Sequence, residues 1–137
     1  MQKLDELYHE ALMEVYRHPL NKSKPKSFDE VWSGNNPLCG DKVEIFVKWD
    51  KNGKVKNVGW QGDGCAISQV ATSLFSDHIK GRTSDEIKEL STEKMLEMLG
   101  IKKMNPTRMR CATLPLEAMK TPASSRGRGT RPSGSRR

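Results

Sequence analysis

The 137-residue sequence lacks a long apolar run and lacks a basic N-terminus. No stretch approaches the roughly 18 to 20 consecutive apolar residues that a membrane-spanning helix requires. The first turns of the chain carry Asp5, Glu6, Glu10 and Glu14, whereas signal and transit peptides are poor in acidic residues. We therefore expect a cytoplasmic protein without a membrane segment or a targeting peptide.

Cysteine is also scarce, since Cys39, Cys65 and Cys111 are the only three. An odd number of widely spaced cysteines does not suit a secreted disulfide framework, but it suits reduced thiols used as ligands or nucleophiles. The sequence contains no Cys-x-x-Cys pair, the spacing that structural zinc sites often use. These absences argue for a functional thiol site rather than a disulfide framework or a structural zinc site.

Acidic residues are missing from the last part of the chain, residues 121–137, which contains five arginines. The net charge of +7 therefore falls to +2 over residues 1–120 once those five are subtracted. Residues 121–137 are rich in Ser, Gly, Pro and Arg, a composition that cannot bury a core. We expect one domain over residues 1–120 and a disordered basic tail, either native or vector-derived.

Hydrophobic periodicity predicts the main elements. Apolar side chains alternate with other residues from Lys42 to Trp49, which predicts a strand with Val43, Ile45 and Val47 on one face. Turn residues at 50–53 predict a hairpin with a second strand. The predicted elements are a helix over about 2–17, a short edge strand near 31–33, strands over 42–49 and 54–60, and helices over 67–79, 83–90 and 91–99, with a last helix ending near Lys120.

The hairpin brings candidate metal ligands together. Cys39 and Asp41 precede its first strand and Cys65 follows its second, so antiparallel pairing places them at one end of the sheet. Cys65 also stands at or near a predicted helix N-terminus, where the helix dipole favours a thiolate. With Cys111 they make four ligands for a soft metal, three thiolates and one carboxylate.

The position of Cys111 is predicted from Pro115. Proline in a helix interior clashes with the carbonyl four residues earlier, here that of Cys111. We therefore expect Cys111 in a loop or the first turn of the last helix, with Thr113 as the N-cap.

Three segments carry a family resemblance. They are Asn36-Pro37-Leu38-Cys39-Gly40-Asp41, Gly62-Asp63-Gly64-Cys65-Ala66-Ile67-Ser68 and Arg108-Met109-Arg110-Cys111-Ala112-Thr113-Leu114. In this order they resemble the signature segments of the IscU/NifU/SufU iron-sulfur scaffold family, over roughly residues 2–120. The resemblance implies an α+β fold in which helices pack on one face of a small antiparallel sheet of about three strands, with the metal site at one exposed end.

The resemblance also implies a function. Such scaffolds receive sulfur from a cysteine desulfurase, assemble a [2Fe-2S] type of cluster and pass it to apo iron-sulfur proteins. They are carriers rather than enzymes. Cys39, Cys65 and Cys111 would be ligands, Asp41 an exchangeable fourth ligand, and Cys111 also the persulfide acceptor. Arg108 or Arg110 would steady the anionic sulfur species, while Gly40, Gly62 and Gly64 would bend the loops.

Two differences from the family's pattern leave open which branch of the family this chain resembles more closely. The IscU branch has a histidine directly before the third cysteine and, upstream, a Leu-Pro-Pro-Val-Lys segment that a DnaK-type chaperone recognises. The chain has neither, which argues against a chaperone handover. The Arg-x-x-Cys-Ala-Thr-Leu arrangement resembles the SufU branch, in which the same four ligands hold zinc and one thiolate accepts sulfur. The insertion that SufU proteins carry between the second and third cysteines is absent.

Simpler interpretations compete with each assignment. A single cysteine is often a small buried apolar residue, although glycine-flanked loops are poor places for a core. His9, His18 and His78 fit packing or capping better than metal ligation. The apolar stripe of the first helix is either core or a docking surface. A zinc-stabilised module that binds RNA through the tail is a third alternative, but nothing outside the tail points to nucleic acid, so we do not expect a nucleic-acid partner.

Overall fold

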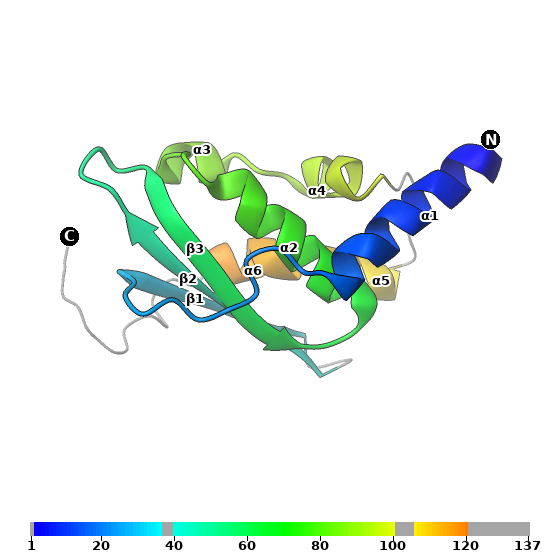
Figure 1. Ribbon diagram of the computed structural model, residues 1–137, viewed down its shortest axis with the longest axis horizontal. Helices are drawn as coiled ribbons and strands as arrows, with labels where there is room; N and C mark the ends of the chain where they lie inside the picture. The colour runs from blue at the N-terminus through cyan, green and yellow to red at the C-terminus, as the bar shows by residue number, and fades with distance from the viewer. Residues whose placement is uncertain (1, 37–39, 101–105, 121–137) are drawn as a thin grey trace.

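The computed structural model describes residues 2–36, 40–100 and 106–120 and has the expected α+β architecture (Figure 1). Cys39 and the 121–137 tail lie outside the described residues, so the predicted domain boundary at residue 120 stays a prediction. The elements in chain order are α1 (Gln2–Arg17), β1 (Glu30–Asn36), β2 (Asp41–Trp49), β3 (Val55–Asp63), α2 (Ala66–Ile79), α3 (Ser84–Lys88), α4 (Thr92–Leu99), α5 (Pro106–Ala112) and α6 (Leu114–Met119).

The three strands form one antiparallel sheet in the order β1-β2-β3. Trp32, Ile45 and Trp60 are partners across it. The predicted hairpin is confirmed, and β1 and β3 extend beyond the predicted 31–33 and 54–60. The sheet ends where Asn36 pairs with Asp41 and Lys42 pairs with Asp63. These pairings place the starts of β2 and α2 at the same end.

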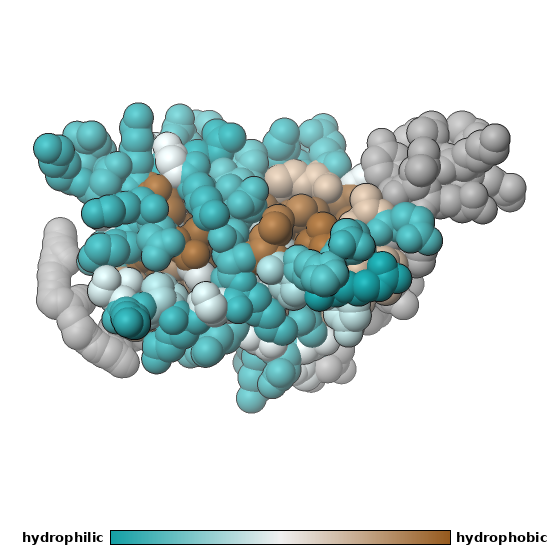
Figure 2. All heavy atoms as spheres, viewed as in Figure 1, coloured by the Kyte–Doolittle hydropathy of each residue, from teal (hydrophilic) through white to brown (hydrophobic). Residues whose placement is uncertain are grey.

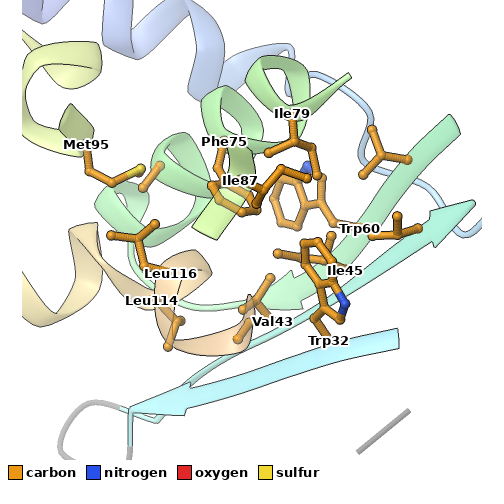
Figure 3. Packing of buried hydrophobic residues seen from close by; sticks show 14 of the residues in the cluster. Trp32, Val43, Ile45, Trp60, Phe75, Ile79, Ile87, Met95, Leu114 and Leu116 are labelled. Carbon is orange, nitrogen blue, oxygen red and sulfur yellow. The ribbon is translucent and has the colours of Figure 1, made fainter. Parts of the chain in front are cut away.

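Helices cover one face of this sheet (Figure 1). The alternating side chains of β2 that were predicted to share a face are buried, with Ile45 and Val47 fully inaccessible to solvent. Trp32 lies 6.4 Å from Phe75 of α2, ring centre to ring centre, in an edge-on contact. Figure 3 shows the sheet residues meeting α2, α4 and α6, whose contributions include Phe75, Ile79, Met95, Leu114 and Leu116.

Close backbone approach sets the position of α6 on the sheet. A Cβ added at Gly34 of β1 would come within 3.0 Å of the Ala118 Cβ and 3.1 Å of the Leu114 carbonyl oxygen. Any larger residue would push α6 away from β1. Since α5 directly precedes α6, this contact also helps to place Cys111.

Local capping explains where the short helices start and stop. Thr83 and Glu86 form a reciprocal capping box at α3, and the Ser91 hydroxyl accepts the Lys94 N–H at α4. Gly100 ends α4 with a φ of 71°, a conformation that glycine adopts without strain. These helices therefore match the sequence prediction closely.

The segment between α1 and β1, residues 18–29, crosses the outer face of the sheet and covers part of it. Phe46 of β2 points away from the helices yet is buried, because Phe28 lies 5.0 Å from its ring centre and the Lys24 ammonium lies 5.5 Å from it. Next to it, Gly59 has no room for a side chain, since a Cβ there would overlap the Ser23 carbonyl oxygen. The alternation pattern alone did not predict this cover.

The face of the molecule seen in Figure 2 is mostly hydrophilic. Figure 2 shows apolar side chains over α2 in the middle of one face, surrounded by hydrophilic residues. Leu12 and Val15 of α1 pack against the core, which supports the core interpretation of that stripe, while Tyr16 remains 39% exposed. Within the described ranges, no helix combines the length and apolarity needed to cross a membrane.

Candidate metal site

Three of the four predicted ligands meet at one end of the sheet. A carboxylate oxygen of Asp41 and the sulfurs of Cys65 and Cys111 lie within 4.8 Å of one another. Ligands around a tetrahedral zinc ion are about 3.3–3.8 Å apart, given bond lengths of about 2.0–2.3 Å. The Asp41 Oδ2 to Cys65 sulfur distance of 3.4 Å already lies in this range, and the widest spacing among the three atoms would have to shorten by at most about 1–1.5 Å for them to share one ion. Cys39 lies outside the described residues, so its ligation stays a prediction.

Asp41 supplies a buried carboxylate at the start of β2. Asp41 is only 2% exposed. It follows Gly40, which has a φ of 74°. The Gly40 N–H donates to the Asn36 carbonyl oxygen at 2.8 Å, so the chain turns back between two paired residues. This turn aims the Asp41 side chain at the start of α2. There Oδ1 accepts the Cys65 N–H at 3.1 Å, and Oδ2 lies 3.4 Å from the Cys65 sulfur.

Cys65 is the N-cap residue of α2, as predicted. Its backbone is extended, and its side chain makes no capping hydrogen bond, which leaves the sulfur directed at the Asp41 carboxylate. The positive end of the helix dipole favours negative charge at this position. Cys65 is partly exposed, whereas Asp41 and Cys111 are buried. The site is therefore accessible from solvent on its Cys65 side.

Gly64 is required by the close packing of this loop. A Cβ at Gly64 would lie 2.7 Å from the Ser68 hydroxyl and 2.8 Å from both the carboxyl carbon and Oδ1 of Asp41. Gly64 was predicted to bend the loop, and its contacts give a second reason for a glycine at this position. The absence of a side chain lets the Asp41 carboxylate reach Cys65.

The prediction for Cys111 is wrong in one respect. Cys111 lies near the C-terminal end of α5, not in a loop or in the first turn of the last helix. Pro115 excludes only an uninterrupted helix, and the chain satisfies this restriction by ending α5 at Ala112 and starting α6 at Leu114. Thr113 is the N-cap, as predicted, but its hydroxyl donates back to the Met109 carbonyl oxygen at 2.9 Å instead of capping α6.

The two arginines that were predicted to steady sulfur species both precede Cys111 in the sequence. Arg110 is on the surface of α5, adjacent in sequence to the buried Cys111, and the Arg108 side chain lies outside the description. Their role stays a prediction. Gly62, the third glycine, is needed for strand packing, because a Cβ there would be 2.5 Å from the Lys42 carbonyl oxygen.

Two neighbours of the site were not identified from the sequence. The buried Ser68 lies with its hydroxyl 3.9 Å from the Cys65 sulfur and donates to the Cys65 carbonyl oxygen at 3.0 Å. Gln69 donates to the Gly64 carbonyl oxygen at 3.1 Å. Their position in the first turn after Cys65 was the available signal, since side chains there can reach back to the preceding loop.

The chain is similar in sequence to known proteins. Residues 7–126 match the family of NifU-like N terminal domains. The chain is 30% identical to the zinc-dependent sulfurtransferase SufU of Bacillus subtilis, with 85% of this chain and 88% of the relative covered. It is 31% identical to the iron-sulfur cluster assembly enzyme IscU of Drosophila melanogaster, with 83% and 74% covered.

Solved structures show the same arrangement of elements. A SufU protein from Fervidobacterium islandicum superposes with a TM-score of 0.67 at 26% identity, covering 81% of this chain and 92% of that one. The N-terminal part of a NifU-like protein from Brucella abortus has a TM-score of 0.58 at 22% identity, covering 88% and 85%.

Proposed function

This chain belongs to the family of NifU-like N-terminal domains, and from that membership and its site we propose that it is a scaffold for iron-sulfur cluster assembly. It receives sulfur from a cysteine desulfurase, builds a [2Fe-2S] type of cluster on Cys39, Asp41, Cys65 and Cys111, and passes the cluster to apo-proteins. The observation that carries the proposal is the meeting of Asp41, Cys65 and Cys111 within 4.8 Å.

The donor set suits a transient cluster. Thiolates bind iron strongly, whereas a carboxylate is a harder and weaker partner for a thiolate-bound cluster. The Asp41 carboxylate is held by the Cys65 N–H, so it stays in place when the metal leaves. Asp41 and Cys65 therefore need no large rearrangement between the empty and the loaded site. It stores and releases a product, and it is a carrier rather than an enzyme.

Sulfur enters by thiol-persulfide exchange. A thiolate of the scaffold attacks the terminal sulfur of the desulfurase persulfide, a new S–S bond forms, the old one breaks, and the desulfurase thiolate leaves. Each transferred sulfur then needs two electrons from a dithiol or ferredoxin type of reductant to become sulfide. This chemistry needs reduced thiols, which is consistent with a cytoplasmic location.

The resemblance implies that Cys111 is the first acceptor, and Cys65 is the more exposed of the two described cysteines. Cys111 is 2% exposed, so transfer to it requires α5 to move, whereas Cys65 is partly exposed. Peptide mapping of the persulfide after one turnover, in the parent chain and in Cys65→Ser and Cys111→Ser, identifies the acceptor.

A second function is favoured by the SufU relative, whose name includes zinc dependence and sulfur transfer. In that alternative the same four ligands hold a resident zinc ion, for which three thiolates and a carboxylate are a suitable donor set. Zinc would keep the thiolates deprotonated and oriented. One of them would accept sulfur while the chain stimulates the desulfurase.

Anaerobic reconstitution separates the two functions. The chain is incubated with ferrous iron, a desulfurase, cysteine and a reductant, and then examined by absorption and Mössbauer spectroscopy and zinc analysis. A stoichiometric [2Fe-2S] spectrum that moves to apo-ferredoxin supports the scaffold. Tightly held zinc that iron does not replace, with faster desulfurase turnover, supports the sulfur acceptor. A chain that binds neither metal contradicts both, and Cys65→Ser is the negative control.

A further inference from the structure

One peptide group at the site, the one that joins Gly64 to Cys65, is held at both of its ends. Its N–H, which belongs to Cys65, donates to Asp41 Oδ1 at 3.1 Å. Its carbonyl oxygen, which belongs to Gly64, accepts Gln69 Nε2 at 3.1 Å. Rotation of this peptide would turn the Cys65 backbone and move its sulfur, so both hydrogen bonds restrain the thiolate.

Gln69 is itself oriented by a residue far away in the sequence. Lys22 Nζ donates to Gln69 Oε1 at 2.8 Å. An amide has one acceptor end and one donor end, so a cation at the oxygen leaves the NH₂ group for the Gly64 carbonyl. Gln69 therefore bridges the segment after α1 and the loop that carries Cys65.

Lys22 follows a firmly attached part of that segment. The Trp60 indole N–H donates to the Leu20 carbonyl oxygen at 2.8 Å, and the Trp60 backbone N–H donates to the Asn21 carbonyl oxygen at 3.0 Å. The Asn21 side chain also donates to the Ser76 hydroxyl at 3.0 Å. The Lys22 ammonium lies 5.2 Å from the Trp60 ring centre. Lys22 is thus placed by the edge strand β3 and by α2.

We propose that Gln69 is a positioning residue of the metal site. Together with Lys22, it fixes the Gly64–Cys65 peptide so that the Cys65 sulfur and the Asp41 carboxylate face the same ion. Retention of the metal then depends on the segment between α1 and β1, although that segment supplies no ligand. This inference rests on the proposed function only in that the site binds a metal.

The test uses the full zinc-loaded chain and measures zinc release into an excess of a chromophoric chelator. Gln69→Met keeps the length of the side chain but removes both hydrogen bonds. We expect release to become roughly threefold to tenfold faster, the effect of one net hydrogen bond. Lys22→Met should give a smaller increase, and the double variant should match Gln69→Met, because Lys22 acts through Gln69.

Lys80→Met is the matched control. Like Lys22→Met, it removes one positive charge. It also breaks the ion pair between Lys80 and Asp77 at the end of α2 that is far from Cys65. Its zinc release should equal that of the parent chain. Release from Gln69→Met that is no faster than from Lys80→Met would overturn the proposal, as would additive effects of the Lys22 and Gln69 changes. A drop in melting temperature without faster release would indicate a merely structural role and also overturn it.

A second readout needs no metal. In the metal-free chain, Gln69→Met should accelerate hydrogen exchange of the Cys65 amide relative to Lys80→Met, and unchanged exchange would contradict the inference. If the parent chain retains no zinc or iron at all, the proposed function fails, while exchange of the Cys65 amide still shows whether Gln69 restrains the Gly64–Cys65 peptide.

Discussion

At the scale of single residues, Asp41 has two roles that oppose each other. As the proposed fourth ligand it would make that position exchangeable, because a carboxylate is a harder donor than the three thiolates. As a hydrogen-bond acceptor it holds the Cys65 N–H at 3.1 Å. We predict that the first role dominates, so that Asp41→Ala slows the loss of an assembled cluster.

The measurement is the decay of the cluster absorption under a chelator. Asp63→Ala is the control, since it removes an exposed carboxylate from the same end of the sheet. Faster decay in Asp41→Ala than in the parent protein would show that support of Cys65 matters more than ligand exchange.

Gly64 is the second residue whose effect can be predicted. A methyl group there would overlap the Asp41 carboxylate, which lies 2.8 Å from the Cβ position. Gly64→Ala should therefore weaken zinc binding by roughly 10- to 100-fold, the usual cost of disturbing groups that orient ligands. Competition with a chelator of known affinity measures it.

Gly81→Ala separates this clash from simple backbone strain. Gly81 has a φ of 78° and open space around its Cβ position, far along the chain from the ligands. This variant should lower the melting temperature but leave the zinc affinity unchanged. Equal affinities in Gly64→Ala and Gly81→Ala would contradict the packing argument.

At the scale of elements, the predictions from sequence succeeded where a local signal was enough. The alternation in β2, the turn after it and the approximate ranges of α3 and α4 were predicted from the sequence and were confirmed. The site was also visible in part, because a hairpin necessarily brings Asp41 and Cys65 to one end of the sheet.

The errors and omissions arose where a local restriction allows more than one structure or where distant segments decide the outcome. A proline restricts only the turn before it, so Pro115 could not exclude the separate helix α5 that contains Cys111. Nothing near Phe46 indicates that Phe28 covers it. Lys22 and Gln69 are 47 positions apart, and only the fold brings them together.

The element α2 also carries a pH-sensitive group. Burial lowers the pKa of His78 below its ordinary value of 6.5, and the positive charges of Arg82 and Lys94 lower it further. The folded state therefore favours the neutral imidazole, while the unfolded chain takes up a proton near pH 6.5. This contribution to the free energy of unfolding is complete above pH 6.5 and is lost as the pH falls through that value toward the lowered pKa.

We predict that His78→Gln reduces the difference in free energy of unfolding between about pH 7.5 and about pH 5.5, which bracket the ordinary histidine pKa. Denaturant unfolding of the metal-free chain, with chelator present, is the appropriate measurement, because metal binding has its own pH dependence. A variant that keeps the full pH dependence of the parent chain would refute the assignment to His78.

At the scale of the whole molecule, the metal should act as a cross-link between elements. The candidate ligands come from β2, from the start of α2 and from α5. Without a cation, thiolates and a carboxylate this close together repel one another, and a metal that binds only the folded chain adds its binding energy to stability. Among the described elements, α5 lies against α2 and α6 and makes no comparable contact with the sheet, so a shared ion would tie it to β2.

We therefore predict that chelation loosens α5 more than the rest of the fold. Saturation at about 100 times the dissociation constant contributes about 2.7 kcal/mol. For a chain of this size, its loss should lower the melting temperature by roughly 5 to 10 °C. Hydrogen exchange should accelerate most in Pro106–Ala112 and least in β2. In Cys65→Ser, chelator should change neither quantity, because the ligand set is already incomplete. A parent chain whose melting temperature and α5 exchange are unchanged by chelation would show that the fold closes this site without the metal.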